Sequence, residues 1–193
     1  MQKQFRIYLL ICLCMSSLFS AKSQPKKAEP IPTRILFLFD ASQSMLARWQ
    51  SDTKYNIAKK LMSNILDSLQ NKTNLQLALR VYGHQKKFPP QDCDDTKLEV
   101  PFGYNNGYKI KRRLNELSPS GTTPIARTLT ACAADFPQSP GRNIVILITD
   151  GIEECEGNPC KVSVELQKKG IFLRPFVIGI GLDVKFADVF GCM

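Results

Sequence analysis

Three oxygen-bearing side chains alternate directly after an apolar segment of the chain. The apolar segment reads Arg-Ile-Leu-Phe-Leu-Phe at residues 34–39, and it is followed by Asp40, Ser42 and Ser44. Side chains that alternate in this way along one loop can converge on a single point. Carboxylate and hydroxyl oxygens without a soft ligand favour a hard cation, with Mg²⁺ as the first choice and Ca²⁺ or Mn²⁺ as substitutes.

Two further segments carry the same kinds of oxygen ligand. Thr123 ends the loop Ser-Pro-Ser-Gly-Thr-Thr, and Asp150 follows a second apolar segment at 144–149. Each residue alone is explained more simply, because aspartate and serine are common turn residues and threonine often caps a helix. Taken together and in order, the set favours a metal site. Its members are Asp40, Ser42, Ser44, Thr123 and Asp150.

The elements around these residues predict an α/β domain. Apolar residues recur every four positions from Ile57 to Leu69, which predicts a helix over about 53–70. Strands are expected at 34–39, 75–82, 98–102, 144–149 and 171–180, and further helices at 108–117, from Pro124 onward and at 159–169. Alternating strands and helices predict a doubly wound, mostly parallel sheet with helices on both faces. Pro101 marks 98–102 as one short antiparallel strand at the edge of that sheet.

This fold explains why separate segments would share one site. In doubly wound sheets, ligands bind at the carboxyl ends of the strands, where the connecting loops meet. Asp40 and Asp150 each follow a predicted strand, and Thr123 is expected to cap the helix that Pro124 opens. The loops that carry the oxygen ligands are therefore expected to lie together at one edge of the sheet.

The first 23 residues differ from the rest of the chain. Lys3 and Arg6 precede an apolar run at 7–15 that is too short to span a bilayer, and small residues lead to Ser23. This pattern predicts a secretory signal peptide over 1–23, with a retained N-terminal membrane anchor as the alternative. A secreted, periplasmic or cell-surface protein is expected, without a transmembrane segment after cleavage.

A linker rich in proline and charge follows at 24–33, and the domain is expected over 34–193. The pattern of a further helix begins at Asp183, so the domain is expected to be truncated within its last helix. An apolar content of 44% in 193 residues suits one globular domain. The formal net charge is +9, but the basic residues are scattered without interleaved aromatics, so no nucleic-acid partner is expected.

The cysteines are expected to form disulfides, because the chain is expected to be exported. Cys155 and Cys160 enclose a Gly-Asn-Pro turn that can bring the two thiols together, and they are the best candidate pair. Cys93 with Cys132 is one possibility among the others. With Cys192 the count after the signal peptide is odd, so at least one thiol is free or pairs outside the chain.

Structural roles are expected for the single histidine, the single tryptophan and a group of acidic residues. His84, the single histidine, is expected to be hydrogen-bonded in a structural role. Trp49 is expected to pack against the sheet or the first helix. The acidic residues Glu153, Glu154 and Glu156 could raise the affinity for a cation, but a solvated loop is the preferred interpretation.

The three oxygen-bearing segments resemble the metal-ion-dependent adhesion site (MIDAS) of the von Willebrand factor type A (VWA) domain family. The match consists of Asp-x-Ser-x-Ser at 40–44, Gly-Thr-Thr-Pro at 121–124 and Thr-Asp-Gly at 149–151, in the order of the family. The resemblance implies that the two serines and a threonine hold the ion directly and that the aspartates act partly through water. Thr122 or Thr123 could be that threonine, and the position before proline matches the family better.

This chemistry predicts an interaction module and not an enzyme. Neutral hydroxyl ligands leave a divalent cation under-neutralised, so a carboxylate from a partner can complete its coordination. The resemblance implies that the partner is a protein offering an Asp or Glu side chain to a bound Mg²⁺.

Two alternatives stay open. One is a Mg²⁺-dependent, phosphatase-like hydrolase with Asp40 as the nucleophile, although such enzymes need a second aspartate where this chain has Ser42. The other is a scaffold in which the metal is purely structural.

Overall fold

A computed structural model of the protein describes residues 30–168, 176–181 and 190–191. Residues Ile31–Met193 form one compact unit. The predicted signal peptide at 1–23 and most of the predicted linker at 24–33 lie outside the described residues, and so does most of the segment at 182–193 where a truncated helix is expected.

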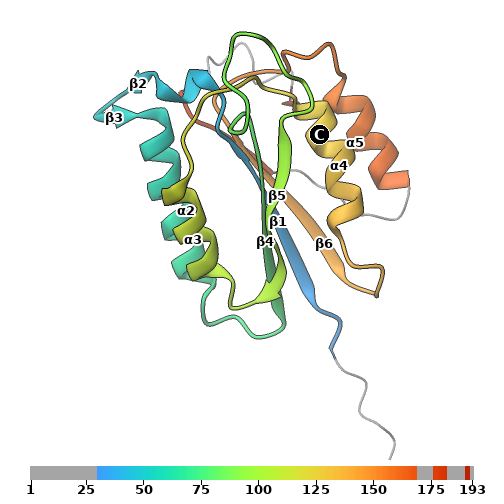
Figure 1. Ribbon diagram of the computed structural model, residues 1–193. Helices are drawn as coiled ribbons and strands as arrows, with labels where there is room; N and C mark the ends of the chain where they lie inside the picture. The colour runs from blue at the N-terminus through green and yellow to red at the C-terminus, as the bar shows by residue number, and fades with distance from the viewer. Residues whose placement is uncertain (1–29, 169–175, 182–189, 192–193) are drawn as a thin grey trace, which may run out of the picture. The chain divides into compact units, whose positions relative to one another are not determined.

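The centre of the domain is a five-stranded sheet with the strand order β5-β4-β1-β6-β7 (Figure 1). Its strands are β1 (Thr33–Asp40), β4 (Leu75–Tyr82), β5 (Thr96–Tyr104), β6 (Arg142–Thr149) and β7 (Phe176–Gly179). The pairs β1/β4, β1/β6 and β6/β7 are parallel, and β5 runs antiparallel to β4 at the edge. The predicted α/β fold with its antiparallel edge strand is confirmed.

The apolar run of β1 is continuous because both faces of the strand are buried. Phe37 and Phe39 point into one core cluster, and Leu36 and Leu38 point into a second cluster on the opposite face. All four side chains are fully buried. The middle of the sheet is therefore a rigid support for the residue that follows, Asp40.

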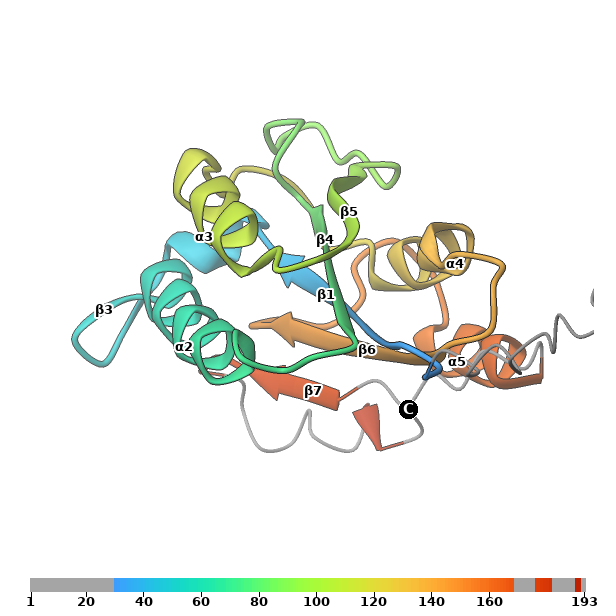
Figure 2. The ribbon, with the colours of Figure 1, turned by 90° about the horizontal axis from the view of Figure 1, so that it is seen from below.

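Helices cover both faces of the sheet (Figures 1 and 2). One face is covered by α2 (Lys54–Leu69) and α3 (Gly107–Glu116), and the other by α4 (Ile125–Asp135) and α5 (Pro159–Lys168). The apolar residues spaced by four that predicted α2, from Ile57 to Leu69, are only partly buried, and the fully buried side of the helix lies next to them. Its buried residues are Tyr55, Ala58, Met62 and Leu66.

A short ribbon between β1 and α2 was not predicted. The chain passes through a 3-10 helix, η1 (Gln43–Leu46), and then through β2 (Arg48–Trp49) and β3 (Asp52–Thr53), which pair antiparallel. Strands of two residues are too short to produce a sequence pattern. Trp49 packs against the core cluster on the α2 face, as expected.

The topology places the loops after β1 and β6 at a switch point. From β1 the chain crosses through α2 to β4 on one side of β1, and it later returns to β6 on the other side. Loops that leave in opposite directions open a crevice at the carboxyl end of the central strand. Within the described ranges, no helix is both long enough and apolar enough to cross a membrane.

Candidate metal centre

Asp40 is the last residue of β1 and is fully buried. Its Oδ1 accepts a hydrogen bond from the backbone N–H of Ser42 over 2.8 Å, and its Oδ2 accepts one from Thr149 Oγ1 over 2.7 Å. Burial raises the pKa of Asp40 to about 6, and the nearby negative charge of Asp150 adds to this shift. A bound cation would relieve both effects.

The two serines connect Asp40 to Asp150. Ser42 Oγ and Ser44 Oγ lie 3.0 Å apart and share a hydrogen bond, and Ser44 Oγ donates to Asp150 Oδ1 over 2.7 Å. The structure therefore brings Asp40, Ser42, Ser44 and Asp150 together in one hydrogen-bonded chain. These groups come from two loops that are 106 residues apart along the sequence.

Lys54 is a member of this site that sequence reasoning missed. Its Nζ donates to Asp150 Oδ2 over 2.8 Å, and its side chain is 17% exposed whereas that of Asp150 is fully buried. Lys54 is the first residue of α2, and its backbone N–H bonds to Ala47 O over 2.9 Å. No spacing in the sequence relates this lysine to Asp150, because the irregular segment from η1 to β3 determines where α2 begins.

The Gly-Thr-Thr-Pro loop lies beside Ser42. Ser42 and Gly121 form an isolated parallel bridge, and Gln43 N–H donates to Gly121 O over 2.8 Å. A Cβ atom at Gly121 would lie 2.7 Å from Lys86 O and 2.8 Å from an oxygen of Asp95, so only glycine fits this close approach. The third predicted segment is therefore next to the other two.

The two threonines of this loop differ in their environment. Thr122 Oγ1 is buried and has no hydrogen-bond partner within the described part of the chain. Thr123 is also buried, and its N–H and C=O both bond to Glu154 over 3.1 Å. Buried hydroxyl groups nearly always have a partner. The hydrogen bonds of Thr123 in the described structure come from its backbone and leave its hydroxyl group uncommitted, so both threonines stay candidate ligands.

The serines open onto a surface pocket of about 480 Å³. Its lining residues are Ser42, Gln43, Ser44, Phe88, Gln91, Gly121 and Glu154. The carboxylates of Asp40 and Asp150 lie below this surface, since both residues are buried. Ser44 is exposed at this surface, Ser42 lines the pocket although it is only 1% exposed, and both carboxylates are buried.

Comparison of the sequence with known protein families identifies the family of this domain. A family model of the von Willebrand factor type A domain covers residues 35–188. The chain belongs to this family. The chain is 33% identical over 194 aligned positions to the uncharacterised protein YwmC of Bacillus subtilis, a match that covers 96% of this chain and 82% of YwmC.

Solved structures of other proteins have the same fold. An aerotolerance-related membrane protein from Bacteroides fragilis has a TM-score of 0.62 at 23% identity, over 78% of this VWA domain chain and 68% of that chain. Proximal thread matrix protein 1 from the mussel byssus has a TM-score of 0.62 at 25% identity. The match covers 83% of this chain and 39% of that chain, whose structure is described with a zinc-occupied MIDAS motif. A divalent metal is therefore plausible at the corresponding site of this VWA domain.

The acidic pair in the loop after β6 has structural contacts. Glu153 Oε2 accepts from Ala126 N–H over 2.6 Å and its Oε1 accepts from Cys155 N–H over 2.8 Å. A carboxylate at the N-terminus of a helix stabilises it, so Glu153 caps α4. Thr123 was expected to cap α4, and this prediction was wrong. Helix α4 begins at Ile125, its N-cap residue is Pro124, and the side chain of that residue forms no capping hydrogen bond. The solvated-loop interpretation fails for Glu153.

The predicted Cys155–Cys160 disulfide was wrong, and the possible Cys93–Cys132 pair does not form. Cys155 pairs with Cys93 across 62 residues, and Cys160 is disulfide-bonded to a different cysteine. The reason is that α5 begins at Pro159, so Cys160 lies within the helix whereas Cys155 stays in the preceding loop. Cys132 is buried in α4 as a free thiol, and burial raises its pKa to about 12.

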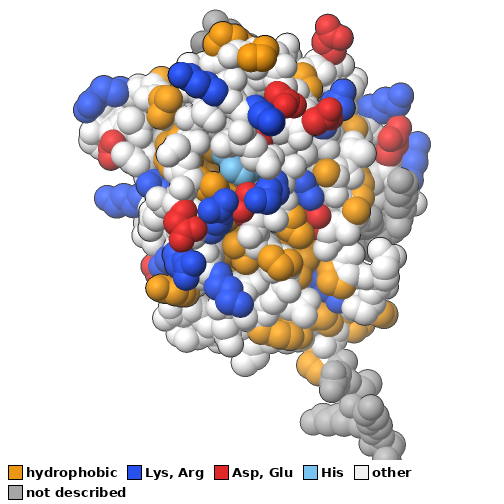
Figure 3. Space-filling view, in the orientation of Figure 1, with side chains coloured by type: hydrophobic (Ala, Val, Ile, Leu, Met, Phe, Trp, Pro, Cys, Tyr) orange, Lys and Arg blue, Asp and Glu red, His pale blue; other side chains and the backbone are white. Residues whose placement is uncertain are grey.

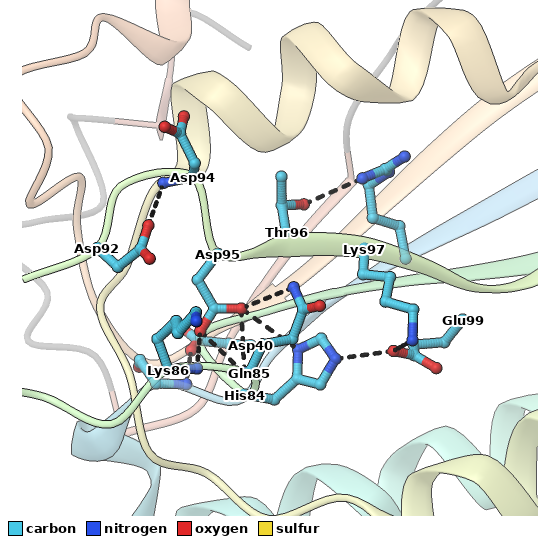
Figure 4. Close-up of polar contacts among 12 residues, drawn as sticks. Asp40, His84, Gln85, Lys86, Asp92, Asp94, Asp95, Thr96, Lys97 and Glu99 are labelled. Atoms are coloured by element: carbon cyan, nitrogen blue, oxygen red, sulfur yellow. Dashed lines mark hydrogen bonds and ion pairs between the residues drawn. The ribbon is translucent and has the colours of Figure 1, made fainter.

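His84 has the structural surroundings that were expected (Figure 4). Its Nε2 lies 2.9 Å from Glu99 Oε1, while the carboxylate of Asp95 accepts the backbone N–H groups of Gln85 and Lys86. These bonds hold the beginning of the loop between β4 and β5. The loop reaches the pocket at Phe88, and its conformation therefore bears on the surface around the two serines.

Proposed function

We propose that this VWA domain binds a protein partner through a divalent cation. The single observation that carries the proposal is the pair of serine hydroxyls, 3.0 Å apart, that line an open pocket above two buried carboxylates. VWA domains commonly mediate metal-dependent protein interactions, and this arrangement suits that role. Lys and Arg side chains on the face seen in Figure 3 are interspersed with acidic and apolar ones.

The residues present fit a hard divalent cation. Ser42, Ser44 and Thr122 or Thr123 would supply hydroxyl oxygens, and Asp40 and Asp150 would supply negative charge. Across the described residues, no cluster of three His, Cys, Asp or Glu side chains could hold a metal by itself, so the hydroxyls are needed. We propose Mg²⁺ as the ion, with Ca²⁺ or Mn²⁺ as substitutes. Bound there, the cation would offer a coordination position to an Asp or Glu carboxylate of the partner.

The contacts of Asp40 argue against the hydrolase alternative. Both oxygens of its carboxylate accept hydrogen bonds, over 2.8 and 2.7 Å, and the residue is fully buried. A nucleophile has to reach the substrate, and Asp40 is not among the residues that line the pocket. The open pocket also argues against a metal that is purely structural, because such a site is normally closed.

We further propose that the protein acts outside the cytoplasm. The predicted signal peptide over 1–23 is the basis of this proposal. The Cys93–Cys155 disulfide supports it, since disulfides persist in oxidising compartments and are rare in the cytosol.

Metal titration of the purified chain tests the proposed function. Isothermal titration calorimetry with MgCl₂ and MnCl₂ should detect one site, and Ser42→Ala combined with Ser44→Ala should abolish it while circular dichroism stays unchanged. Ser68→Ala is the matched control, because Ser68 Oγ bonds only to the backbone of α2 in the described structure. Metal binding that survives the double substitution would overturn the proposal.

A further inference from the structure

We infer that the partner segment carries a large apolar side chain next to the docking carboxylate, and that Phe88 receives it. This inference rests on the proposed function and adds the class of segment that the site selects. Phe88 is 41% exposed and lines the same pocket as Ser42 and Ser44. An aromatic side chain beside a polar docking point is typical of residues that dominate binding energy.

Phe88 stands out from the other exposed apolar residues by its position. The large hydrophobic side chains that are exposed in the described structure are Ile31, Leu46, Phe88, Tyr104, Tyr108 and Val164. Of these, Phe88 lines the pocket that contains the serines, whereas Tyr108 lines a separate pocket near the beginning of β4. A single exposed hydrophobic residue needs no explanation, but one inside the candidate site does.

The loop that presents Phe88 is held from one side by backbone contacts. Phe88 N–H donates to Ser120 O over 2.8 Å, next to the Gly-Thr-Thr-Pro loop. The Asp95 carboxylate accepts the N–H groups of Gln85 and Lys86, each over 3.0 Å. The aromatic ring is therefore presented by a backbone that the domain itself orders.

The same loop is held from the other side by the segment after β6. Gln91 Nε2 donates to Glu154 O over 2.6 Å, and Cys93 forms the disulfide with Cys155. Because the wall of the pocket is ordered before binding, a partner side chain that packs on Phe88 does not have to order a loop. Pre-organisation of this kind increases affinity by lowering the entropic cost of association.

The negative charge of Glu154 restricts the kind of partner segment that fits the pocket. Glu154 is exposed, lines the pocket and accepts the N–H of Thr123 through its carboxylate. A second carboxylate on the partner near Phe88 would face this negative charge. The structure thus favours a segment in which one Asp or Glu is flanked by apolar residues, and it disfavours a polyacidic segment.

Three labelled peptides test this inference on the full chain. The peptides are Gly-Leu-Asp-Leu-Gly, Gly-Ser-Asp-Ser-Gly and Gly-Leu-Asn-Leu-Gly, each with an N-terminal fluorescein, and binding is measured by fluorescence polarisation in excess MgCl₂ and in EDTA. In MgCl₂ the Leu-flanked Asp peptide should bind about tenfold more tightly than the Ser-flanked one, because a leucine side chain is removed from water. The Asn peptide should bind only weakly.

Substitutions of Phe88 assign the preference to this residue. Phe88→Ala should reduce the difference between the two Asp peptides to less than twofold, and Phe88→Leu should keep most of it. Tyr108→Ala removes an exposed aromatic that is outside the pocket, and it should leave the difference unchanged. Thermal unfolding of each variant controls for folding.

The outcomes separate the inference from the proposed function. If both Asp peptides bind equally well in MgCl₂ and Phe88→Ala changes neither, the inference is overturned while the metal-dependent docking stands. If the Asn peptide binds as tightly as the Asp peptide, or EDTA has no effect, the proposed function fails and the inference fails with it.

Discussion

The ammonium group of Lys54 and the hydroxyl of Ser44 bind opposite oxygens of one carboxylate, that of Asp150. Lys54 Nζ lies 2.8 Å from Oδ2, and Ser44 Oγ lies 2.7 Å from Oδ1. The first residue of α2 therefore neutralises an aspartate of the proposed metal site from within the chain. A divalent cation at the serines would share this carboxylate with the lysine, and the two positive charges would repel each other.

Removal of the lysine charge should increase the affinity for metal. Lys54→Met keeps much of the side-chain volume, and we expect it to tighten Mg²⁺ binding about tenfold or more, because charge-assisted hydrogen bonds contribute about 1.5–3 kcal/mol. Calorimetric titration measures the change, with Lys72→Met as a control at a lysine that lines a different pocket. Weaker Mg²⁺ binding by Lys54→Met would show that the lysine supports the ion instead of competing with it.

The two threonines of the loop should respond differently to loss of the hydroxyl group. Thr122→Val removes a buried hydroxyl that has no partner in the described structure, and we expect a loss of metal affinity on the order of tenfold or more. Thr123→Val makes the same isosteric change at the second candidate ligand, whose hydrogen bonds with Glu154 come from its backbone. Both variants are compared by Mg²⁺ titration. A larger loss of Mg²⁺ affinity in Thr123→Val than in Thr122→Val would identify Thr123 as the ligand, which is the assignment that the family resemblance favours.

The buried carboxylate of Glu99 should make stability depend on pH. Burial alone would raise its pKa, but hydrogen bonds from Arg113, His84 and Lys97 outweigh this and hold the pKa at about 2, below its ordinary 4.5. A lowered pKa means that the stabilisation is complete above pH 4.5 and is lost as the pH falls toward 2. Glu99→Gln should therefore lower the free energy of unfolding by about 2 kcal/mol at pH 7.

Urea unfolding at a series of pH values measures this effect. The difference between Glu99→Gln and the parent protein should shrink between pH 4.5 and pH 3. Glu116→Gln is the control, because Glu116 lies on the exposed side of α3 and bonds to the same arginine, Arg113. A difference that stays constant down to pH 3 would contradict the assigned role of the Glu99 carboxylate.

The residues that follow strands were predictable from the sequence, and the reason is geometric. A strand buried on both faces reads as a continuous apolar run, as β1 and β6 do, so its carboxyl end is visible at Asp40 and Asp150. Parallel neighbours then bring these ends together. The hydrogen-bonded chain from Asp40 through the serines to Asp150 follows from this arrangement.

Residues on irregular segments were not predictable in the same way. Lys54 reaches the site because η1 and a two-residue ribbon orient the beginning of α2, and such short elements leave no periodic pattern. Phe88 and Cys93 lie in the loop between β4 and β5. The expected Cys155–Cys160 pair considered only the local turn, whereas the tertiary structure places Cys155 beside Cys93.

The position of a bound metal ion tests the central claim most directly. Crystals of the chain grown with MnCl₂, measured above the manganese absorption edge, reveal the ion by its anomalous scattering. The account predicts one Mn²⁺ in contact with Ser42 Oγ and Ser44 Oγ, at the pocket that Phe88 lines. A Mn²⁺ ion bound elsewhere, with both serines retaining their hydrogen bond to each other, would contradict it.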